Sequence, residues 1–359
     1  MASHPNFFLM STIRYGFIGA GQIAEYSANI INGHANSSVV AVQDLSAERL
    51  ADLSAKCRIP KTYATAAELF ADPEVDAVYI AVPNKFHVPL TLQALEAGKH
   101  VMLEKPFAMN YAEAQQAADA AQKAGKVLTL GMNQRFGQNQ QKFRTLVEKG
   151  SFGEIYHAKA YWYRRTGIPK LGTWFGNREI AGGGCLYDIG VHLLDLCLYV
   201  IGRFDAVSVS GNTYTKFGNR GLGEGGWGKS DREGILFDVE DFATAHIRFA
   251  DGLSVSLDVS WACHTAQGNR LDVEIFGTEA GGKVMDGRVF RRDAQTSEYV
   301  TLEEIPAAVR FPHGERFHNF TNHLLDGEEL CVTIDQALAV QKILDGIAES
   351  SRTGREVVL

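Results

Sequence analysis

The 359-residue sequence lacks any run of about 18 consecutive apolar residues, which is the length that a membrane-spanning helix needs. Its start also does not resemble an export signal, because the apolar patch at residues 7–10 is short and no basic segment precedes it. The sequence therefore predicts a protein without a membrane partner that stays in the cytoplasm.

Cysteine is scarce, and its spacing is not that of a bonded framework. The five cysteines stand far apart, at positions 57, 185, 197, 263 and 331, and no two form a Cys-x-x-Cys pair. An odd number of scattered cysteines is typical of reduced thiols in a reducing compartment. No Cys/His set has the spacing of zinc ligands, so we expect no metal site.

Positive charge is not in excess. Lys and Arg total 35 against 42 for Asp and Glu, the net charge is −7, and the basic residues do not cluster. Because attraction to a phosphate backbone requires a positive field, the sequence excludes nucleic acid as a partner. The hydrophobic share of 45% and the charged share of 21% are those of a globular chain, and the length fits two domains.

Residues 1–131 alternate short apolar runs with amphipathic helical patterns. The apolar runs are nearly continuous, as in a parallel sheet covered on both faces, and they predict strands over 13–18, 39–43, 77–82, 100–103 and 127–130. Helical patterns between them span 48–57, 88–97 and 111–123. This alternation predicts an α/β fold with an N-terminal Rossmann doubly wound parallel sheet.

Residues 132–359 show the two-residue alternation of a half-covered antiparallel sheet. Strands are predicted over 154–164, 206–214, 242–249, 253–261 and 271–276, and Asp251-Gly252 predicts a hairpin turn. The other expected features are a long helix over 187–201, a polar surface loop over 212–234 and a closing helix over 335–350. We predict a C-terminal α+β domain with a large open, mostly antiparallel sheet, and expect the closing helix to pack back towards the first domain.

A dinucleotide-binding pattern follows the first predicted strand. In Gly19-Ala20-Gly21-Gln22-Ile23-Ala24, Gly19 suits a tight turn, Gly21 lets the backbone approach a pyrophosphate, and Ala24 permits close packing of helix and strand. Asp44 ends the second strand, 23 residues after Gly21, where a carboxylate binds a ribose 2′-hydroxyl and repels a 2′-phosphate. We expect NAD rather than NADP, although Arg49 could turn towards a phosphate. The cofactor-binding residues predicted at this end are Gly19, Gly21, Gln22, Ile23 and Asp44.

Two further segments carry candidate chemistry. Lys105, in Glu104-Lys105-Pro106, directly follows a buried strand, and the carboxyl ends of parallel strands face the ligand crevice, so we expect it near the nicotinamide. Asp188 and His192 stand four residues apart after a run of three glycines, which places them on one face of the predicted helix. The alternatives are a surface lysine beside a turn and an Asp–His pair that only braces an apolar helix.

Other polar side chains follow strand ends or lie before the long helix. The remaining predicted contacts to the cofactor come from Pro83, Asn84, His87, Glu104, Lys105 and Asn133. His87 could equally begin a helix without touching a ligand. Aromatic rings beside arginines suit a sugar face and its hydroxyl groups, although strand packing or a subunit contact would explain them as well. The predicted substrate-binding residues are Lys105, Arg164, Arg165, Trp174, Asp188 and His192.

The segments GFIGAGQIA, VPNKFHVPLTLQALEAGKHVMLEKP and GGGCLYDIGVHLLDLCLYVIG together resemble the Gfo/Idh/MocA family of oxidoreductases, which includes glucose–fructose oxidoreductase and inositol dehydrogenase. The resemblance extends from residue 13 to the end of the chain. It implies that Lys105, Asp188 and His192 are the catalytic residues and act on a sugar hydroxyl.

The chemistry of these residue types agrees with the resemblance. A histidine can act as general base on a secondary hydroxyl, and an ammonium favours the developing alkoxide. Asp188 would hold a substrate hydroxyl, His192, or both. We expect an NAD-dependent oxidoreductase for a secondary hydroxyl of a sugar, inositol or sugar derivative. The alternatives are an NADP-dependent aldose or sugar reductase, a cofactor-recycling aldose oxidoreductase and a non-catalytic NAD-binding regulator.

The C-terminal sheet also predicts self-association. In residues 253–261, the odd-numbered residues are apolar and fall on one side, whereas Ser254, Ser256, Asp258 and Ser260 fall on the other. A small, polar face of this kind can pack flat against an identical face around a two-fold axis, or it can meet water. With the resemblance, it predicts a homodimer or homotetramer that assembles through this sheet.

Overall fold

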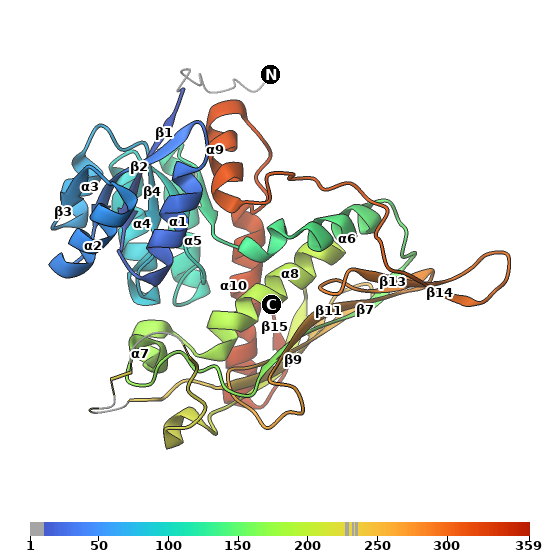
Figure 1. Ribbon diagram of the computed structural model, residues 1–359. Coiled ribbons are helices and arrows are strands. Elements are labelled where there is room, and N and C mark those ends of the chain that lie inside the picture. Colours follow the sequence, from blue (N-terminus) through green and yellow to red (C-terminus); the bar gives the residue numbers. More distant parts are fainter. Residues whose placement is uncertain (1–10, 227–229, 232, 234–235) are drawn as a thin grey trace.

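The computed structural model describes residues 11–226, 230, 231, 233 and 236–359, and in it the chain folds around two sheets (Figure 1). The apolar patch at 7–10 lies outside the described residues. Of the loop expected over 212–234, residues 212–214 belong to a strand, 215–226 are mainly irregular, and 227–229, 232 and 234 lie outside the described residues. The expected loop therefore began three residues too early.

The first sheet is a six-stranded Rossmann sheet with the strand order β3-β2-β1-β4-β5-β6, and all its pairs are parallel. Its strands are β1 (Ile13–Ile18), β2 (Ser37–Gln43), β3 (Lys61–Tyr63), β4 (Ala77–Ile80), β5 (His100–Leu103) and β6 (Leu128–Leu130). The helices that connect them are α1 (Gln22–Asn32), α2 (Ala47–Cys57), α3 (Ala66–Ala71), α4 (His87–Glu96) and α5 (Tyr111–Ala124). The predicted doubly wound fold is confirmed, with β3 and α3 added.

The second sheet has nine strands in the order β14-β13-β12-β11-β7-β10-β9-β8-β15. Its strands are β7 (Ile155–Arg164), β8 (Ser208–Tyr214), β9 (Phe242–Arg248), β10 (Ser254–Ser260), β11 (Asn269–Gly277), β12 (Ala280–Lys283), β13 (Arg288–Arg292), β14 (Tyr299–Leu302) and β15 (Val357–Val358). It is mixed but mostly antiparallel, since β7 and β10 pair in parallel in its centre. The hairpin predicted at Asp251-Gly252 joins the antiparallel pair β9 and β10.

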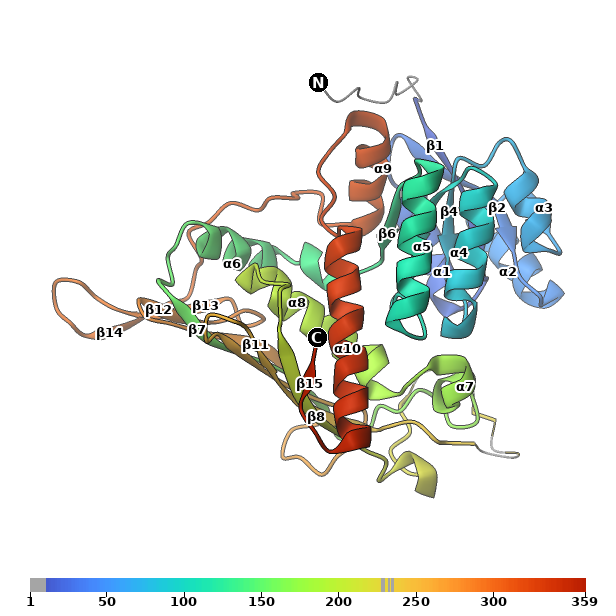
Figure 2. The ribbon, with the colours of Figure 1, turned by 180° about the vertical axis from the view of Figure 1, so that it is seen from behind.

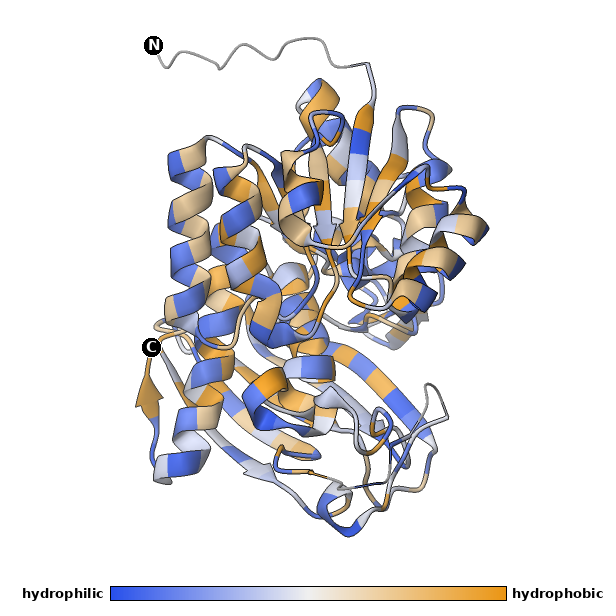
Figure 3. Cartoon of the chain, turned by 90° about the vertical axis from the view of Figure 1, so that its left-hand side faces the viewer, coloured by the Kyte–Doolittle hydropathy of each residue, from blue (hydrophilic) through white to orange (hydrophobic). Residues whose placement is uncertain are grey.

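One face of the second sheet is covered, and the other is open. On β10, Val255, Leu257 and Val259 are fully buried, whereas Ser256 and Asp258 are only half-buried. Ser260, which was predicted on the same open face, is fully buried at the end of the strand. The covered face packs against α8 (Val191–Ile201), and Figure 3 shows the alternation of hydrophobic and hydrophilic residues along the strands. The run Arg178–Ile201 is apolar and long enough to cross a membrane, but 89% of its most apolar window is buried inside the molecule. It is therefore a core segment.

Two helices near the end of the chain tie the sheets together. The long helix α10 (Ile334–Thr353) contacts both α5 of the first sheet and β8 of the second (Figure 2). The helix α9 (Arg316–Asp326) lies against the Rossmann sheet, where Phe317 and Phe320 are fully buried in the same cluster as Tyr15 and Tyr79. Residues distant in the sequence thus complete the hydrophobic core of the first domain.

The long helix expected over 187–201 is divided in the structure. Residues Leu186–Gly190 form a π-helical turn, and the regular helix α8 begins at Val191. The remaining helical elements are α6 (Gln138–Glu148), α7 (Arg178–Ala181) and the short turns η1 (Asn84–Phe86), η2 (Asn133–Phe136), η3 (Trp174–Gly176) and η5 (Gly218–Arg220). The π turn matters for function because it carries Asp188.

Candidate active site

The glycine-rich turn after β1 has the geometry that a bound dinucleotide requires. Gly19 has a φ of +100°, and a Cβ there would lie 2.3 Å from the main-chain oxygen of Ala81, so only glycine fits. Gly21 is the N-cap of α1, and a Cβ built on it would meet nothing within 4 Å. The space in front of Gly21 and the first-turn N–H groups of Gln22 and Ile23 suit a pyrophosphate.

Asp44 lies directly beside this turn. One carboxylate oxygen accepts a hydrogen bond from the main-chain N–H of Ala20, and the other accepts one from that of Ser46, both at 2.8 Å. The guanidinium of Arg49 is more distant, at 3.7 Å from Asp44, and it is largely exposed. The carboxylate is therefore oriented by the backbone at the end of β2, where an adenosine ribose binds in Rossmann domains.

The Lys105 ammonium and the Asp188 carboxylate form an ion pair between the two domains. Lys105 follows β5, and its Nζ lies 2.9 Å from Asp188 Oδ1 and 3.3 Å from the Asp188 main-chain oxygen. The second carboxylate oxygen, Oδ2, accepts a 2.8 Å hydrogen bond from the indole Nε1 of Trp261. The structure thus brings the predicted residues Lys105 and Asp188 together. It adds Trp261, which the sequence predicted only as a residue of the covered face of the sheet.

Asp188 remains ionised despite its burial. Burial by itself would raise the pKa of the carboxyl group, but the charge and hydrogen bond of Lys105 and the hydrogen bond of Trp261 outweigh it. The nearby charge of Arg164 acts in the same direction. The pKa of Asp188 is therefore lowered from its ordinary value, and the site holds a stable carboxylate–ammonium pair.

The polypeptide before Asp188 is held by a buried glutamate. Glu240 Oε1 accepts hydrogen bonds from the main-chain N–H groups of Gly184, at 2.7 Å, and Leu186, at 3.1 Å. These bonds bind N–H groups at the start of the π turn that a regular helix would leave without partners. π turns are frequent at functional sites, and this one sets the direction of Asp188.

His192 is neutral and close to this pair. In the part of the chain that the structure describes, its buried Nδ1 has no hydrogen-bond partner. Burial and the Lys105 ammonium lower the pKa of His192 to about 3, although the Asp188 carboxylate acts in the opposite direction. Asp188 lies in the π turn and His192 in the first turn of α8, and the two are close enough for the Asp188 carboxylate to act on the pKa of His192.

Glu104 has partners within the protein. Its Oε1 accepts hydrogen bonds from Tyr79, at 2.6 Å, and from Arg316 of α9, at 2.7 Å. The same guanidinium donates to the main-chain oxygen of Gly131, at 3.1 Å. Arg316 therefore links the carboxyl ends of β4, β5 and β6, which the sequence did not indicate because it lies 212 residues from Glu104.

Of the other residues predicted to contact the cofactor, some have buried side chains and some have side chains that are partly or fully exposed. The imidazole of His87 is fully buried between the main-chain oxygens of Pro106, at 2.8 Å, and Val82, at 3.0 Å, so both of its ring nitrogens have partners within the protein. Asn84 is also buried, and its amide donates to the main-chain oxygen of Ala181, at 2.7 Å. Pro83 is half-buried and Asn133 is exposed.

The two predicted arginines have different environments. Arg164 is half-buried over the Trp162 ring, 4.2 Å from its centre, and its positive charge lowers the pKa of Asp188. Arg165 is exposed, and its guanidinium donates to the main-chain oxygens of Thr265 and Ala266. Trp174 is half-buried and stacks on Phe175 with 3.9 Å between the ring centres.

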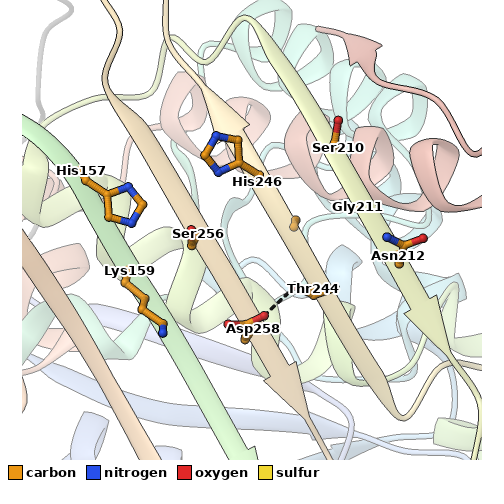
Figure 4. Close-up of a pocket in the computed structure, with 10 residues that line it drawn as sticks. His157, Lys159, Ser210, Gly211, Asn212, Thr244, His246, Ser256 and Asp258 are labelled. Atoms are coloured by element: carbon orange, nitrogen blue, oxygen red, sulfur yellow. Dashed lines mark hydrogen bonds between the residues drawn. The ribbon is translucent and has the colours of Figure 1, made fainter.

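A hollow of about 470 Å³ lies on the open face of the second sheet, opposite the face that packs on α8 (Figure 4). It is lined by His157, Lys159, Ser210, Gly211, Asn212, Thr244, Ala245, His246, Ser256 and Asp258. Its residues come from β7, β8, β9 and β10, and Asp258 accepts a hydrogen bond from Thr244 at 2.6 Å. This hollow is a separate surface from the Lys105–Asp188 site.

In the described ranges, no group of three or more His, Cys, Asp or Glu side chains has a geometry that could hold a metal ion. The site consists instead of a dinucleotide turn, an ammonium–carboxylate pair and a neutral imidazole. A Rossmann domain with these groups at the carboxyl edge of its sheet defines an NAD-binding oxidoreductase.

Comparison with known proteins identifies the family. Residues 13–132 match the family model described as "Oxidoreductase family, NAD-binding Rossmann fold", and residues 140–282 match the GFO/IDH/MocA C-terminal domain. The chain is 32% identical to D-glucoside 3-dehydrogenase of Escherichia coli over 350 residues, which cover 97% of this chain and 98% of that protein. The chain therefore belongs to the Gfo/Idh/MocA family of oxidoreductases.

Solved structures have the same fold over nearly the whole chain. An NAD-binding protein from Listeria innocua superposes with a TM-score of 0.81 at 25% identity and covers 97% of this chain and 100% of its own. Levoglucosan dehydrogenase in complex with NADH and levoglucosan has a TM-score of 0.78 at 22% identity, covering 97% of this chain and 99% of its own. The family resemblance read from the sequence is confirmed.

Proposed function

We propose that the protein transfers hydride between NAD and a secondary hydroxyl of a sugar, inositol or sugar derivative. The observation that carries this proposal is the Lys105–Asp188 pair, at 2.9 Å, with neutral His192 beside it at the carboxyl edge of the Rossmann sheet. This edge is where open α/β sheets bind their ligands.

We propose that NAD is held by Gly19, Gly21, the start of α1 and Asp44. The open space at Gly21 and the backbone-oriented carboxylate of Asp44 support this assignment. When bound, NAD supplies the nicotinamide ring that accepts the hydride. Pro83, Asn133 and the Glu104–Lys105 segment complete the proposed cofactor site, whereas Asn84 would act by shaping the loop after β4.

The three catalytic residues have distinct proposed roles. His192 is neutral at working pH, so its imidazole can accept the hydroxyl proton, and the nearby Asp188 carboxylate favours the imidazolium that results. The Lys105 ammonium favours the developing alkoxide electrostatically. Asp188 holds Lys105 in place and has lone pairs left for a substrate hydroxyl.

The proposed substrate pocket includes Arg164 and Trp174 in addition to the catalytic residues. Arg164 supports this role because it lies on the covered face of β7 and its charge reaches Asp188. The D-glucoside 3-dehydrogenase that covers nearly the whole chain supports a ring hydroxyl of a glucoside as the reacting group.

The proposed function is tested by adding NAD and one candidate alcohol at a time to the purified protein. The panel contains methyl glucoside, levoglucosan, myo-inositol, free aldoses and uronic acids, and the readout is the formation of reduced nicotinamide. We expect turnover with at least one of these alcohols. A protein that binds NAD but oxidises none of them would contradict the proposal.

We further propose a homodimer or homotetramer in the cytoplasm that assembles through the open face of the second sheet. The polar open face, which carries residues such as Ser256, Asp258 and Thr244, supports a self-complementary contact. Light scattering behind a sizing column tests the assembly, and a mass near that of one chain, 39.3 kDa, at all concentrations would contradict it.

We propose a domain boundary near residue 131, so that 1–131 binds the cofactor and 132–359 binds the substrate. The two domains pack closely against each other, because α10 contacts α5 and α9 is buried against the Rossmann sheet. Expression of 1–131 alone would expose the surface that Phe317 and Phe320 cover, so we expect that fragment to be poorly soluble.

A further inference from the structure

The indole of Trp261 is fully buried, and its one hydrogen-bonding atom is used at the candidate active site. Trp261 directly follows β10 on the covered face of the sheet, and its main-chain N–H donates to the Asp241 oxygen at 2.9 Å. The ring also packs edge-on against Phe237, with 6.5 Å between the ring centres. Backbone and ring contacts thus fix the direction of the indole N–H before any ligand binds.

The turn that carries Asp188 packs closely against the same strand. A Cβ on Gly190 would lie 3.2 Å from Val259 Cγ2, and Cys185 Sγ lies 3.7 Å from the Val259 main-chain oxygen. The π turn has little room to move relative to β10. The 2.8 Å hydrogen bond from Trp261 to Asp188 is therefore determined by packed backbone on both sides.

The two donors to Asp188 come from different domains. Lys105 reaches Oδ1 from the Rossmann domain, whereas Trp261 reaches Oδ2 from the domain that carries Asp188 itself. A carboxylate with one partner can rotate about its Cβ–Cγ bond, but one with a fixed donor on each oxygen cannot. Within its own domain, Trp261 gives Asp188 a fixed orientation.

We propose that Trp261 is a positioning residue for the reaction, whose indole N–H orients the Asp188 carboxylate so that Lys105 is held at the substrate hydroxyl. This inference rests on the proposed function, because it assigns a role to the Lys105–Asp188 pair in turnover. It adds a residue outside the predicted site, 73 positions from Asp188.

The first test is Trp261→Phe, which keeps an aromatic ring and removes the donor. We expect kcat to fall about tenfold or more, because misorientation of a catalytic group is costly, while the affinity for NAD stays unchanged. The acid limb of the kcat/KM profile should move to higher pH, because Asp188 loses a hydrogen bond to its ionised form. An unchanged profile would overturn the proposal.

The matched control is Phe237→Leu, which loosens packing around the same indole without removing its hydrogen bond. We expect it to lower the melting temperature but leave the acid limb in place. If Phe237→Leu moves the limb as far as Trp261→Phe does, the effect belongs to packing and the proposal is wrong.

The double variant separates positioning from general support of the fold. If Trp261 acts through Asp188, adding Trp261→Phe to Asp188→Ala should cause no further loss of kcat, because the two changes then disable one unit. Multiplied losses would show that Trp261 acts independently of Asp188 and would overturn the proposal.

A measurement without turnover distinguishes this proposal from the proposed function. Should no alcohol of the panel be oxidised, the proposed function fails, but the Trp261–Asp188 bond is still testable by unfolding between pH 7 and pH 3. We expect Trp261→Phe to be most destabilising at pH 7 and less so as the pH falls through the lowered pKa of Asp188, and its effect should not depend on pH in an Asp188→Ala background. A pH-independent effect in both backgrounds would overturn the inference.

Discussion

The ammonium of Lys105 lies 2.9 Å from the carboxylate of Asp188, and the two residues belong to different domains. Lys105 extends the β5 strand of the Rossmann sheet, whereas Asp188 sits on a π turn that packs on β10 of the second sheet. The cofactor side and the substrate side of the molecule therefore share one charged pair. Changes in either domain that displace this pair should affect turnover.

Substitutions at the two glycines of the dinucleotide turn should have different effects, one on NAD affinity and the other on stability. Gly21→Val places a side chain in open space, so we expect a nearly unchanged melting temperature but at least a tenfold loss of NAD affinity. Gly19→Ala places a Cβ 2.3 Å from the Ala81 oxygen at a φ of +100°, so we expect it to lower the melting temperature. Thermal unfolding with and without NAD measures both effects.

Equal loss of stability in the two glycine variants would contradict this account. So would full retention of NAD affinity in Gly21→Val, because the space before α1 would then not be where the pyrophosphate binds.

Asp44 should determine the choice between NAD and NADP. We expect the native protein to bind NAD more tightly, because the Asp44 carboxylate, held by the N–H groups of Ala20 and Ser46, repels a 2′-phosphate. Asp44→Ala should narrow the difference between the two cofactors, and Arg49→Ala in the same background should widen it again. Titration of both cofactors by fluorescence decides this, and tighter binding of NADP by the native protein would refute it.

His192 should not produce an acid limb near pH 6.5. Burial and the Lys105 ammonium lower its pKa to about 3, so the imidazole is already neutral at pH 5. The same shift weakens it as a base, and the Asp188 carboxylate acts in the opposite direction. We expect His192→Ala to lower kcat by at least about a hundredfold while NAD affinity is retained. Between pH 8 and pH 5, protonation of His192 should therefore cause no fall in the kcat/KM of the native protein. A histidine-like limb near pH 6.5 would contradict the neutral, buried environment.

Asp272 should reduce stability at neutral pH. Burial raises the pKa of this carboxyl group to about 6, against about 3.9 in an unfolded chain. Because the Asp272 carboxyl group holds its proton more tightly in the folded state, its contribution to the free energy of unfolding is fully present below about pH 4. This contribution is lost as the pH rises towards 6. Asp272→Asn retains the oxygen that accepts from Val273 and Met285, so we expect it to stabilise the protein at pH 7 by about 2 kcal/mol.

The difference between Asp272→Asn and the native protein should disappear near pH 4, as measured by denaturant unfolding. Asp286→Asn is the matched control, because Arg288 lowers the pKa of Asp286 and its replacement should not stabilise the protein at pH 7. A constant difference from pH 4 to pH 7 would show that Asp272 is ionised in the folded state.

The sequence predicted those parts of the fold that depend on local patterns. The apolar runs of the Rossmann sheet and the two-residue alternation on β10 both report burial directly, so the strands there were placed within a few residues. The short strands β3 and β12–β15 were missed because two to five residues give too little periodicity. The helix α9 was missed as part of the Rossmann core because its docking depends on contacts about 300 residues apart in sequence, such as the hydrogen bond of Tyr15 with Thr321.

The candidate site was predictable where a motif carries the chemistry and not where tertiary contacts do. Lys105 and Asp188 were identified from their local contexts, and the structure brings them together. Trp261 could not be distinguished from an ordinary core residue, because only the folded chain places its N–H at Asp188. Arg165, predicted beside Arg164, lies just past the end of β7, and its guanidinium donates to the main-chain oxygens of Thr265 and Ala266, which the sequence did not indicate.

The most direct test of the account is the initial rate at which the native protein and Lys105→Met form reduced nicotinamide with the best alcohol of the panel. Lys342→Met, which removes an exposed lysine of α10, is the control. We predict that Lys105→Met lowers kcat at least about a hundredfold with NAD affinity retained, and that Lys342→Met matches the native rate. Near-native turnover in Lys105→Met would contradict the assignment of the Lys105–Asp188 pair as the centre of the reaction.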